Sequence, residues 1–159
     1  MEVRLNGRVY TCLEQLREQA DEELFLFLEE WFDDRSYVLG HTSGSTGAPK
    51  ESKADMRASA RMTNAFFAID RESVLLLCLS VSYIAGKMMV VRALEAGAEL
   101  LTVKVSSHPL RITGQEEYVD RRIDLAAMVP MQVEESMKSE SEKPRFGYIR
   151  HLIIGGAPV

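Results

Sequence analysis

Apolar residues follow two alternating patterns along this chain, one typical of buried strands and one typical of amphipathic helices. The run from Val74 to Leu79 is continuously apolar, which predicts a strand buried on both faces. Other stretches place apolar residues three and four apart, which predicts helices with one buried side. From residue 37 onward the two patterns alternate. Alternation of this kind predicts an α/β fold with a mainly parallel sheet covered by helices.

The same patterns assign elements to most of the chain. Val3 to Tyr10 predicts a hairpin with Asn6-Gly7 as its turn, and Thr11 to Glu14 has capping-box spacing, which predicts the start of a short helix. Further strands are predicted over 37–40, 100–105, 123–129 and 148–154, and further helices over 24–32, 53–70, 84–97 and from Pro130 onward. The segments around 106–112 and 139–146 are expected to be the least ordered.

Several side chains are expected to serve packing alone. The helix over 53–70 is predicted to turn one face to the core, formed by Ala58, Met62, Ala65, Phe66 and Ile69. Trp31 should pack on its amphipathic helix, and Cys78 should be buried and inert. Methionines are flexible fillers of apolar interiors, and core positions are predicted for Met56, Met62, Met88, Met89, Met128, Met131 and Met137.

Composition narrows the classes of function. The formal net charge is -5, which argues against nucleic acid as a partner. No stretch reaches the run of about 18 apolar residues that a membrane helix needs, and the first residues lack the apolar core of a secretory signal. Only Cys12 and Cys78 occur, and two lone cysteines suit a reducing cytoplasm and form no zinc motif. A cytoplasmic protein without a metal site is expected.

The densest chemical signal lies in residues 42–50, Thr-Ser-Gly-Ser-Thr-Gly-Ala-Pro-Lys. Gly44 and Gly47 allow backbone angles that let amide N–H groups point into one concavity, which attracts anions. The hydroxyls of this segment add donors for phosphate oxygens, and Lys50 adds a mobile positive charge. The segment lies between a predicted strand and a predicted helix, where the helix dipole also favours an anion.

Two other interpretations of this segment are open. A Walker A loop requires Gly-Lys followed by Ser or Thr, whereas Pro49 precedes Lys50 here and Glu51 follows it. A Ser/Gly-rich surface loop that binds nothing is the second alternative. The length of the string and its place in a parallel α/β pattern favour a phosphate-binding loop over both.

Residues 42–50 resemble the signature loop of the adenylate-forming superfamily, which contains acyl-CoA ligases, luciferases and peptide-synthetase adenylation domains. That loop has the form Thr-Ser-Gly-Ser/Thr-Thr-Gly-x-Pro-Lys, and every fixed position matches. The resemblance implies that the loop holds the β- and γ-phosphates of ATP while a substrate carboxylate attacks the α-phosphate. It gives this role to Thr42, Ser43, Gly44, Ser45, Thr46, Gly47 and Lys50.

Later segments also resemble this superfamily, from about residue 37 to the end. The segment 77–86 is similar to the family's Leu-Pro-Leu-Phe-His-x-x-Gly, with Ser82-Tyr83 in place of the aromatic-His pair. The segment 149–158 is similar to the strand that ends in Gly-Gly-Ala and lines the adenine and acyl pockets, which implies that role for Gly155, Gly156, Ala157 and Pro158. The implied division is an N-terminal hairpin with helices over 1–36 and an AMP-binding α/β region over 37–159.

The resemblance also implies what the chain does. The family's Tyr-Gly-x-Thr-Glu motif, its Mg²⁺-binding Glu and its catalytic Lys correspond to positions after Val159, so this chain is expected to be the N-terminal part of a longer ligase and to be inactive alone. The parent would use ATP, Mg²⁺ and coenzyme A to convert a small carboxylic acid to its acyl-CoA. Within the family the segment 83–89 is most similar to o-succinylbenzoate–CoA ligases of menaquinone synthesis.

Alternatives to that assignment stay open. The chain could be a non-catalytic fragment that binds a nucleotide or anion, or part of an adenylation enzyme that loads a carrier protein. An incomplete sheet has an exposed edge, so self-association is also open. Tyr83, Gly86 and Lys87 are candidates for the acyl pocket, and Lys87 and Arg92 for a substrate carboxylate, although a solvated helix face is favoured for Lys87 and Arg92. His41 precedes the loop and is expected to pack or cap rather than to touch phosphate.

Overall fold

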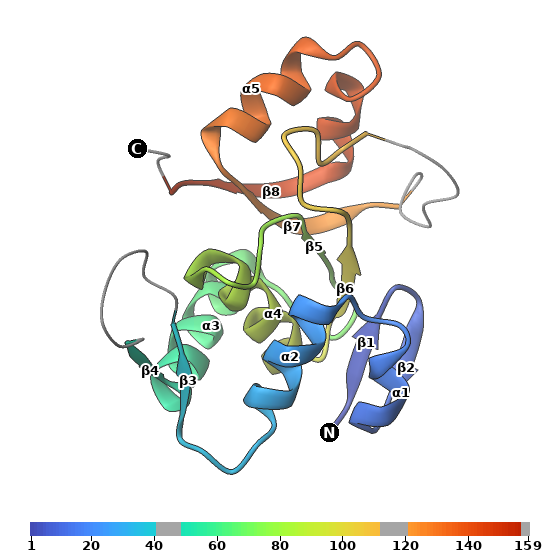
Figure 1. Cartoon of the computed structure of the whole chain (residues 1–159). Helices are drawn as coiled ribbons and strands as arrows, with labels where there is room; N and C mark the ends of the chain where they lie inside the picture. Colours follow the sequence, from blue (N-terminus) through green and yellow to red (C-terminus); the bar gives the residue numbers. More distant parts are fainter. Residues whose placement is uncertain (41–48, 112–120, 157–159) are drawn as a thin grey trace.

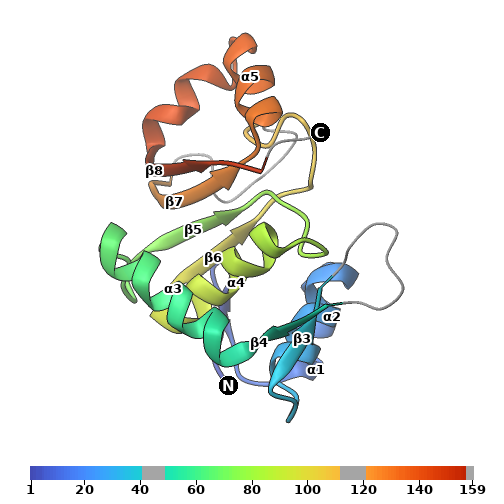
Figure 2. The ribbon, with the colours of Figure 1, turned by 90° about the vertical axis from the view of Figure 1, so that its left-hand side faces the viewer.

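The computed structural model describes residues 1–40, 49–111 and 121–156 of the chain. These residues form a six-stranded sheet with helices on both faces and a separate two-stranded ladder (Figures 1 and 2). The order in the large sheet is β2-β1-β6-β5-β7-β8, and every neighbouring pair is parallel except the β1–β2 hairpin. The predicted α/β fold with a mainly parallel sheet is therefore confirmed.

The elements lie close to their predicted positions. The strands are β1 (Val3–Leu5), β2 (Arg8–Tyr10), β3 (Tyr37–Leu39), β4 (Lys50–Ser52), β5 (Val74–Leu77), β6 (Glu99–Thr102), β7 (Ile123–Met128) and β8 (Ile149–Ile154). The helices are α1 (Leu13–Arg17), α2 (Glu22–Trp31), α3 (Lys53–Phe67), α4 (Ile84–Ala96), α5 (Pro130–Lys138) and the 3-10 helix η1 (Lys143–Tyr148). The strand β4 and the helix η1 were not predicted.

The continuous apolar run of β5 lies at the centre of the sheet and is buried on both sides, as predicted. Leu75 and Leu77 join the apolar core beneath α2 and α4. Val74 and Leu76 point to the opposite face and pack in a second core, which also contains Leu110. The second core is closed by α5 and η1, which lie on the other side of the sheet from α3 and α4 (Figure 2).

The first residues of the chain are part of the large sheet. Asn6 and Gly7 have φ angles of 48° and 83°, so both central turn residues have the positive φ of a type I′ hairpin, as the sequence predicts. β1 then pairs with β6 in parallel. The Asn6 side chain adds hydrogen bonds of 2.9 Å to the Thr102 hydroxyl and from the Thr102 amide, which fix the hairpin against the end of β6.

The helix α3 turns the opposite face to the core from the one predicted. Its buried residues are Lys53, Met56, Ala60 and Asn64, whereas Met62 and Phe66 are 76% and 82% exposed. The polar residues are tolerated because the fold supplies partners: Lys53 Nζ pairs with Asp33 at 2.8 Å, and Asn64 Nδ2 donates to the Arg92 carbonyl at 3.0 Å. The prediction that the more apolar stripe is buried was wrong for the helix itself, although Ile69, which follows the helix, is buried as predicted.

The other packing predictions have mixed outcomes. Trp31 and Cys78 are buried, as predicted. Of the methionines, Met56, Met88, Met89 and Met128 are buried, but Met62, Met131 and Met137 are exposed. The three exposed residues all lie on helices α3 and α5, whose outer faces no other described element covers.

The two segments expected to be least ordered are joined by one buried carboxylate. Glu142 has no exposed surface, and it accepts hydrogen bonds from the Leu110 amide at 3.2 Å, the Ser136 hydroxyl at 3.2 Å and His108 Nδ1 at 2.7 Å. Residues 106–111 are thereby held against the turn that precedes η1. Polar composition suggested loose segments because the shared acceptor is visible only in three dimensions.

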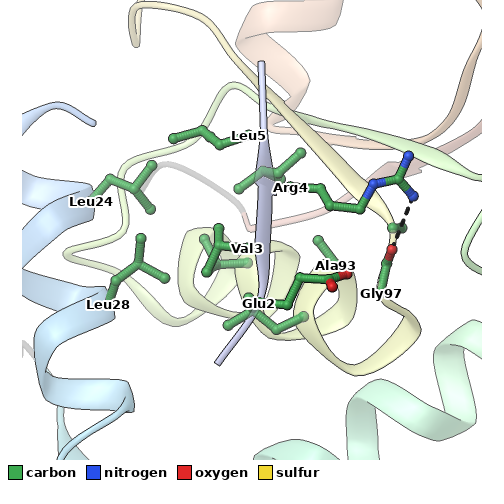
Figure 3. Close-up of a pocket in the computed structure, with 12 residues that line it drawn as sticks. Glu2, Val3, Arg4, Leu5, Leu24, Leu28, Ala93 and Gly97 are labelled. Atoms are coloured by element: carbon green, nitrogen blue, oxygen red, sulfur yellow. Dashed lines mark hydrogen bonds between the residues drawn. The ribbon is translucent and has the colours of Figure 1, made fainter. Parts of the chain in front are cut away.

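A small cavity lies between β1, α2 and α4 (Figure 3). Its volume is about 10 Å³, and its walls include the apolar side chains of Val3, Leu24 and Leu28. A single water needs about 10–15 Å³ and several polar partners. The cavity is therefore a gap in packing and is too small for a substrate. None of the helices in the described ranges is long and apolar enough to cross a membrane.

Candidate substrate site

A much larger cavity opens where β5, β7 and β8 end. Its volume is about 300 Å³. Most of its lining is apolar and comes from the ends of these strands and the first turns of α4, with one charged residue: Leu79, Ile84, Ala85, Met88, Arg92, Ala127, Met128, Ile153, Gly155 and Gly156. In open α/β sheets, ligands bind outside the carboxyl ends of the strands. The cavity lies in that position and has the size and polarity of a small-molecule site.

The glycine pair predicted to line a pocket borders this cavity. The Gly155 amide donates to the Met128 carbonyl at 3.2 Å, which extends the pairing of β8 with β7 to the rim of the cavity. Gly156 has a φ of 74°, a conformation that glycine adopts without strain. The backbone can therefore turn at the rim without a side chain entering the cavity. Ala157 and Pro158, the other two predicted residues, lie outside the described residues.

Arg92 is the charged group of the cavity. Its Nε is buried and has no hydrogen-bond partner among the described residues, and its Nη1 lies 3.4 Å from the Met89 sulfur. Burial lowers the pKa of Arg92. Arginine remains protonated in proteins even so. The predicted solvated helix face therefore does not describe Arg92, whose guanidinium is a half-buried cation with an unused donor beside an apolar cavity.

The other candidates, Tyr83 before α4 and Lys87 in its first turn, lie differently. Tyr83 is 63% exposed and does not line the cavity. Lys87 is 3% exposed, so the favoured solvated position was wrong. Its Nζ donates to the Ser82 carbonyl at 3.1 Å and lies 5.8 Å from the centre of the Phe27 ring. Burial lowers the pKa of Lys87, and the charges of Glu30, Glu23 and Glu51 oppose that shift.

Gly86 fits tightly against the same loop. A Cβ at this position would lie 2.1 Å from the carbonyl oxygen of Ser80, a distance that real Cβ atoms do not adopt. The first turn of α4 can therefore approach the loop only with glycine here. Gly86 and Lys87 thus support the wall of the cavity from behind, and Arg92 alone of the predicted cations faces it.

The predicted phosphate loop is anchored by a short ladder. β3 and β4 are antiparallel, Leu39 pairs with Lys50, and the Gly40 amide donates to the Pro49 carbonyl at 2.7 Å. Lys50 is exposed, and its ammonium lies 4.6 Å from the centre of the Tyr37 ring, a cation–π contact. Thr42, Ser43, Gly44, Ser45, Thr46 and Gly47 lie outside the described residues, as does His41.

The two cysteines differ in exposure and in the chemistry open to them. Burial raises the pKa of the Cys78 thiol to about 12, so this thiol remains protonated and inert, as predicted. Cys12 is exposed. Within residues 1–40, 49–111 and 121–156, no group of three or more His, Cys, Asp or Glu side chains is placed to hold a metal ion.

Comparison with protein families gives one match. The family model described as "AMP-binding enzyme" matches residues 8–159. No match was found among the curated proteins.

Similar folds occur among solved structures. An acyl-CoA synthetase (AMP-forming)/AMP-acid ligase II-like protein from Dyadobacter fermentans is 30% identical over 92% of this chain, with a TM-score of 0.76. ATP-bound MatB from Rhodopseudomonas palustris is 20% identical over 76% of this chain, with a TM-score of 0.58. The o-succinylbenzoate CoA synthetase from Bacillus subtilis, in complex with its acyl-adenylate intermediate, is 18% identical over 76% of this chain, with a TM-score of 0.57.

This chain spans only part of those proteins. It covers 42% of the Dyadobacter protein, 24% of MatB and 31% of the Bacillus enzyme. The second and third likenesses show a shared fold. Together with the first, they place this chain beside proteins that are about two to three times as long.

Proposed function

We propose, from the premise that this chain belongs to the family of AMP-binding enzymes, that it carries the phosphate loop and the acyl cavity of an ATP-dependent, AMP-forming acid–CoA ligase. In this reaction a carboxylate oxygen attacks the α-phosphate of ATP, and the bond from that phosphorus to the pyrophosphate oxygen breaks. The acyl-adenylate then reacts with the thiol of coenzyme A, and AMP leaves. The observation that carries the proposal is the cavity at the carboxyl ends of β5, β7 and β8.

In this proposal the loop stabilises the departing pyrophosphate. Thr42, Ser43, Gly44, Ser45, Thr46 and Gly47 would hold the β- and γ-phosphates, and Lys50 would add charge where negative charge develops. The exposed ammonium of Lys50 rests on the Tyr37 ring, from which it can swing to a phosphate. Mg²⁺, when bound to ATP, neutralises part of the phosphate charge. Gly155, Gly156, Ala157 and Pro158 would border adenine and the acyl group.

The cavity favours an acid that has a second carboxylate. An apolar lining suits an aromatic or aliphatic body, and the positive charge of Arg92, which lines the cavity, suits an anionic group on it. Arginine binds carboxylates through paired, charge-assisted hydrogen bonds. o-Succinylbenzoate has an aromatic ring and two carboxylates, of which one would be activated and the other would meet Arg92. The Bacillus structure holds the adenylate of this acid, which supports it as the first substrate to test.

The decisive experiment compares two acids and two variants by isothermal titration of the 159-residue protein. We expect o-succinylbenzoate to bind about tenfold or more tightly than 4-oxo-4-phenylbutanoate, which lacks the ring carboxylate. Arg92→Met should remove that preference. Arg61→Met, which loses an exposed arginine paired with Glu95 on the outside of α3, should keep it. Equal affinities for the two acids in the unsubstituted protein, or a preference retained by Arg92→Met, would contradict the assignment of Arg92.

Two alternatives make different predictions. A fragment that only binds a nucleotide or anion would bind ATP and ignore both acids. An adenylation enzyme that loads a carrier protein would be followed by a carrier domain in its reading frame. Sequencing the source gene past the Val159 codon decides this point: Tyr-Gly-x-Thr-Glu and a late lysine, without a carrier domain, support the CoA ligase. The 159-residue protein alone is not expected to exchange pyrophosphate into ATP, and measurable exchange would contradict that expectation.

The remaining expectations concern the whole protein. The boundary between residues 36 and 37, the cytoplasmic location and any homo-oligomer stay predictions. So does the use of coenzyme A as acceptor.

A further inference from the structure

Glu23 of α2, in the N-terminal segment, is hydrogen-bonded to a loop that borders the proposed substrate cavity. Its carboxylate accepts hydrogen bonds from the Ser80 hydroxyl at 2.6 Å, the Val81 amide at 3.3 Å and the Ser82 hydroxyl. These three residues lie in the β5–α4 loop (78–83), and they follow Glu23 by nearly 60 positions in the sequence. No role for residues 1–36 was visible in the sequence, because they carry no motif.

The loop that is hydrogen-bonded to Glu23 also borders the cavity. Leu79 lies in this loop and Ile84 follows it, and both line the cavity. Val81 anchors the middle of the loop, since its side chain is 4% exposed and lies in the core beneath α2 and α4. The loop is therefore held both by the packing of the Val81 side chain and by the hydrogen bonds to the Glu23 carboxylate.

Lys87 forms a further hydrogen bond to the same loop. Its Nζ donates to the Ser82 carbonyl at 3.1 Å, so Ser82 is bonded through both its hydroxyl and its carbonyl. Ser82-Tyr83 stand where the family has its aromatic-His pair. In this chain the Ser82 side of that position is fixed by the bonds to Glu23 and Lys87. The exposed Tyr83 side chain forms none of them.

We propose that Glu23 is a positioning residue of the substrate site: it fixes the β5–α4 loop, and through it the Leu79 and Ile84 walls of the cavity. The N-terminal segment thereby takes part in acid recognition without touching the acid. That the cavity binds the acid rests on the proposed function, whereas the hydrogen bonds between Glu23 and the loop do not depend on it.

The negative charge of Glu23 strengthens its hydrogen bonds to the loop. Burial acts to raise the pKa of Glu23, but the hydrogen bonds from Ser80, Ser82 and Val81 outweigh it, so the pKa lies below its ordinary value. The carboxylate is charged at neutral pH and interacts electrostatically with the buried Lys87 ammonium, as Glu30 and Glu51 also do. Hydrogen bonds to a charged acceptor are stronger than those to a neutral one. A glutamine at this position keeps an acceptor but loses the charge.

Amide hydrogen exchange of the 159-residue protein tests directly whether Glu23 holds the β5–α4 loop in place. We expect Glu23→Ala to lower the protection of the Val81 and Ser82 amides by about tenfold, because about one net hydrogen bond's worth of stability is lost. Glu23→Gln should lie between Glu23→Ala and the unsubstituted protein. Glu22→Ala removes the exposed acid one position earlier and should change nothing. The amides of β5 serve as the internal reference, since general destabilisation would lower their protection equally.

Measuring the protection of the loop amides as a function of pH separates the role of the Glu23 charge from that of packing, because packing does not titrate. Since the folded pKa of Glu23 is lowered, the loop should stay protected from neutral pH down to below about pH 4.5 and lose protection as the pH falls through the folded pKa. Glu23→Gln should lack this step. Equal loop protection in Glu23→Ala and the unsubstituted protein, or an identical acid step in Glu23→Gln, overturns the positioning role.

The link to the cavity has its own readout. Titration with o-succinylbenzoate should show weaker binding by Glu23→Ala and unchanged binding by Glu22→Ala. If the unsubstituted protein binds no acid, the proposed function loses its support, and the methyl resonances of Ile84 and Met88 then report the cavity wall instead. These resonances should shift in Glu23→Ala. A loosened loop with unchanged acid binding, or unchanged methyl resonances where no acid binds, would overturn the link between Glu23 and the cavity.

Discussion

The buried ammonium of Lys53 lies 2.8 Å from the carboxylate of Asp33 and 3.0 Å from its backbone carbonyl. The Lys53 side chain is only 4% exposed. A buried ammonium needs a partner because desolvation otherwise costs several kcal/mol. This pair therefore ties the start of α3 to the segment that follows α2, across the base of the β3–β4 ladder.

Replacing Asp33 should expose this dependence. The hydrogen bonds from Arg35 and Lys53 hold the pKa of Asp33 well below its ordinary value. A lowered folded pKa stabilises the fold above the unfolded pKa and ceases to do so as the pH falls through the folded value. We expect Asp33→Asn to lower the denaturation midpoint by a constant amount above about pH 5, and the difference to shrink below about pH 4. Urea denaturation across this range measures it.

The control is the neighbouring acid. Asp34 is exposed, so Asp34→Asn should leave the denaturation midpoint close to that of the unsubstituted protein at every pH. If Asp33→Asn and Asp34→Asn give the same pH profile, the Lys53 pair does not stabilise the fold.

The reversed face of α3 makes a prediction on two methionines of one helix. Met56 is 4% exposed and Met62 is 76% exposed. Met56→Gln places an amide in the core and should cost about 2–4 kcal/mol of unfolding free energy. Met62→Gln should change the unfolding free energy by less than about 0.5 kcal/mol. Chemical denaturation of the two variants is the measurement, and the reverse order would show that the more apolar stripe is the buried one.

The comparison of α3 with β5 shows where sequence patterns succeed. β5 was predicted correctly because a continuous apolar run between turn residues fits a strand buried on both sides. The buried face of α3 could not be predicted, since Lys53 and Asn64 enter the core only because Asp33 and the Arg92 carbonyl, distant in the sequence, receive them. The capping box at Thr11 also failed: Cys12 is the N-cap, and Gln15 accepts from the Thr11 amide.

The candidate site was predictable where it rests on a motif. The glycine pair at the end of β8 was identified from the sequence, and it lies at the cavity. Arg92 and Lys87 could not be told apart, because the direction of each side chain depends on how α4 packs against the sheet and α2. Glu23 was missed altogether, since a glutamate at the start of a helix carries no sign that a loop nearly 60 residues later will donate to it.

A further prediction concerns the buried acceptor Glu142. Glu142→Ala leaves the Leu110 amide, the Ser136 hydroxyl and the His108 ring without their acceptor, and unsatisfied buried donors cost about 1–3 kcal/mol each. We expect a loss of about 3–5 kcal/mol of unfolding free energy, the range for breaking a buried pair. Glu140 is exposed, and Glu140→Ala should cost less than about 0.5 kcal/mol. Equal denaturation midpoints for the two variants would contradict the role given to Glu142.

The last prediction tests whether the close packing behind the cavity matters for its shape. The Cβ of Gly86→Ala would lie 2.1 Å from the Ser80 carbonyl oxygen, which is backbone and cannot rotate away. The loop or the first turn of α4 must move, and overpacking of this kind costs about 1–3 kcal/mol. Since Leu79 lies in the loop and Ile84 follows it, the cavity should change with the loop. Acid binding should therefore weaken even under conditions in which the variant is fully folded. Gly147→Ala is the matched control, because nothing lies within 4 Å of the added Cβ. Denaturation and acid titration of both variants separate the two effects: if Gly86→Ala is destabilised but binds acid like the unsubstituted protein, the loop does not shape the cavity.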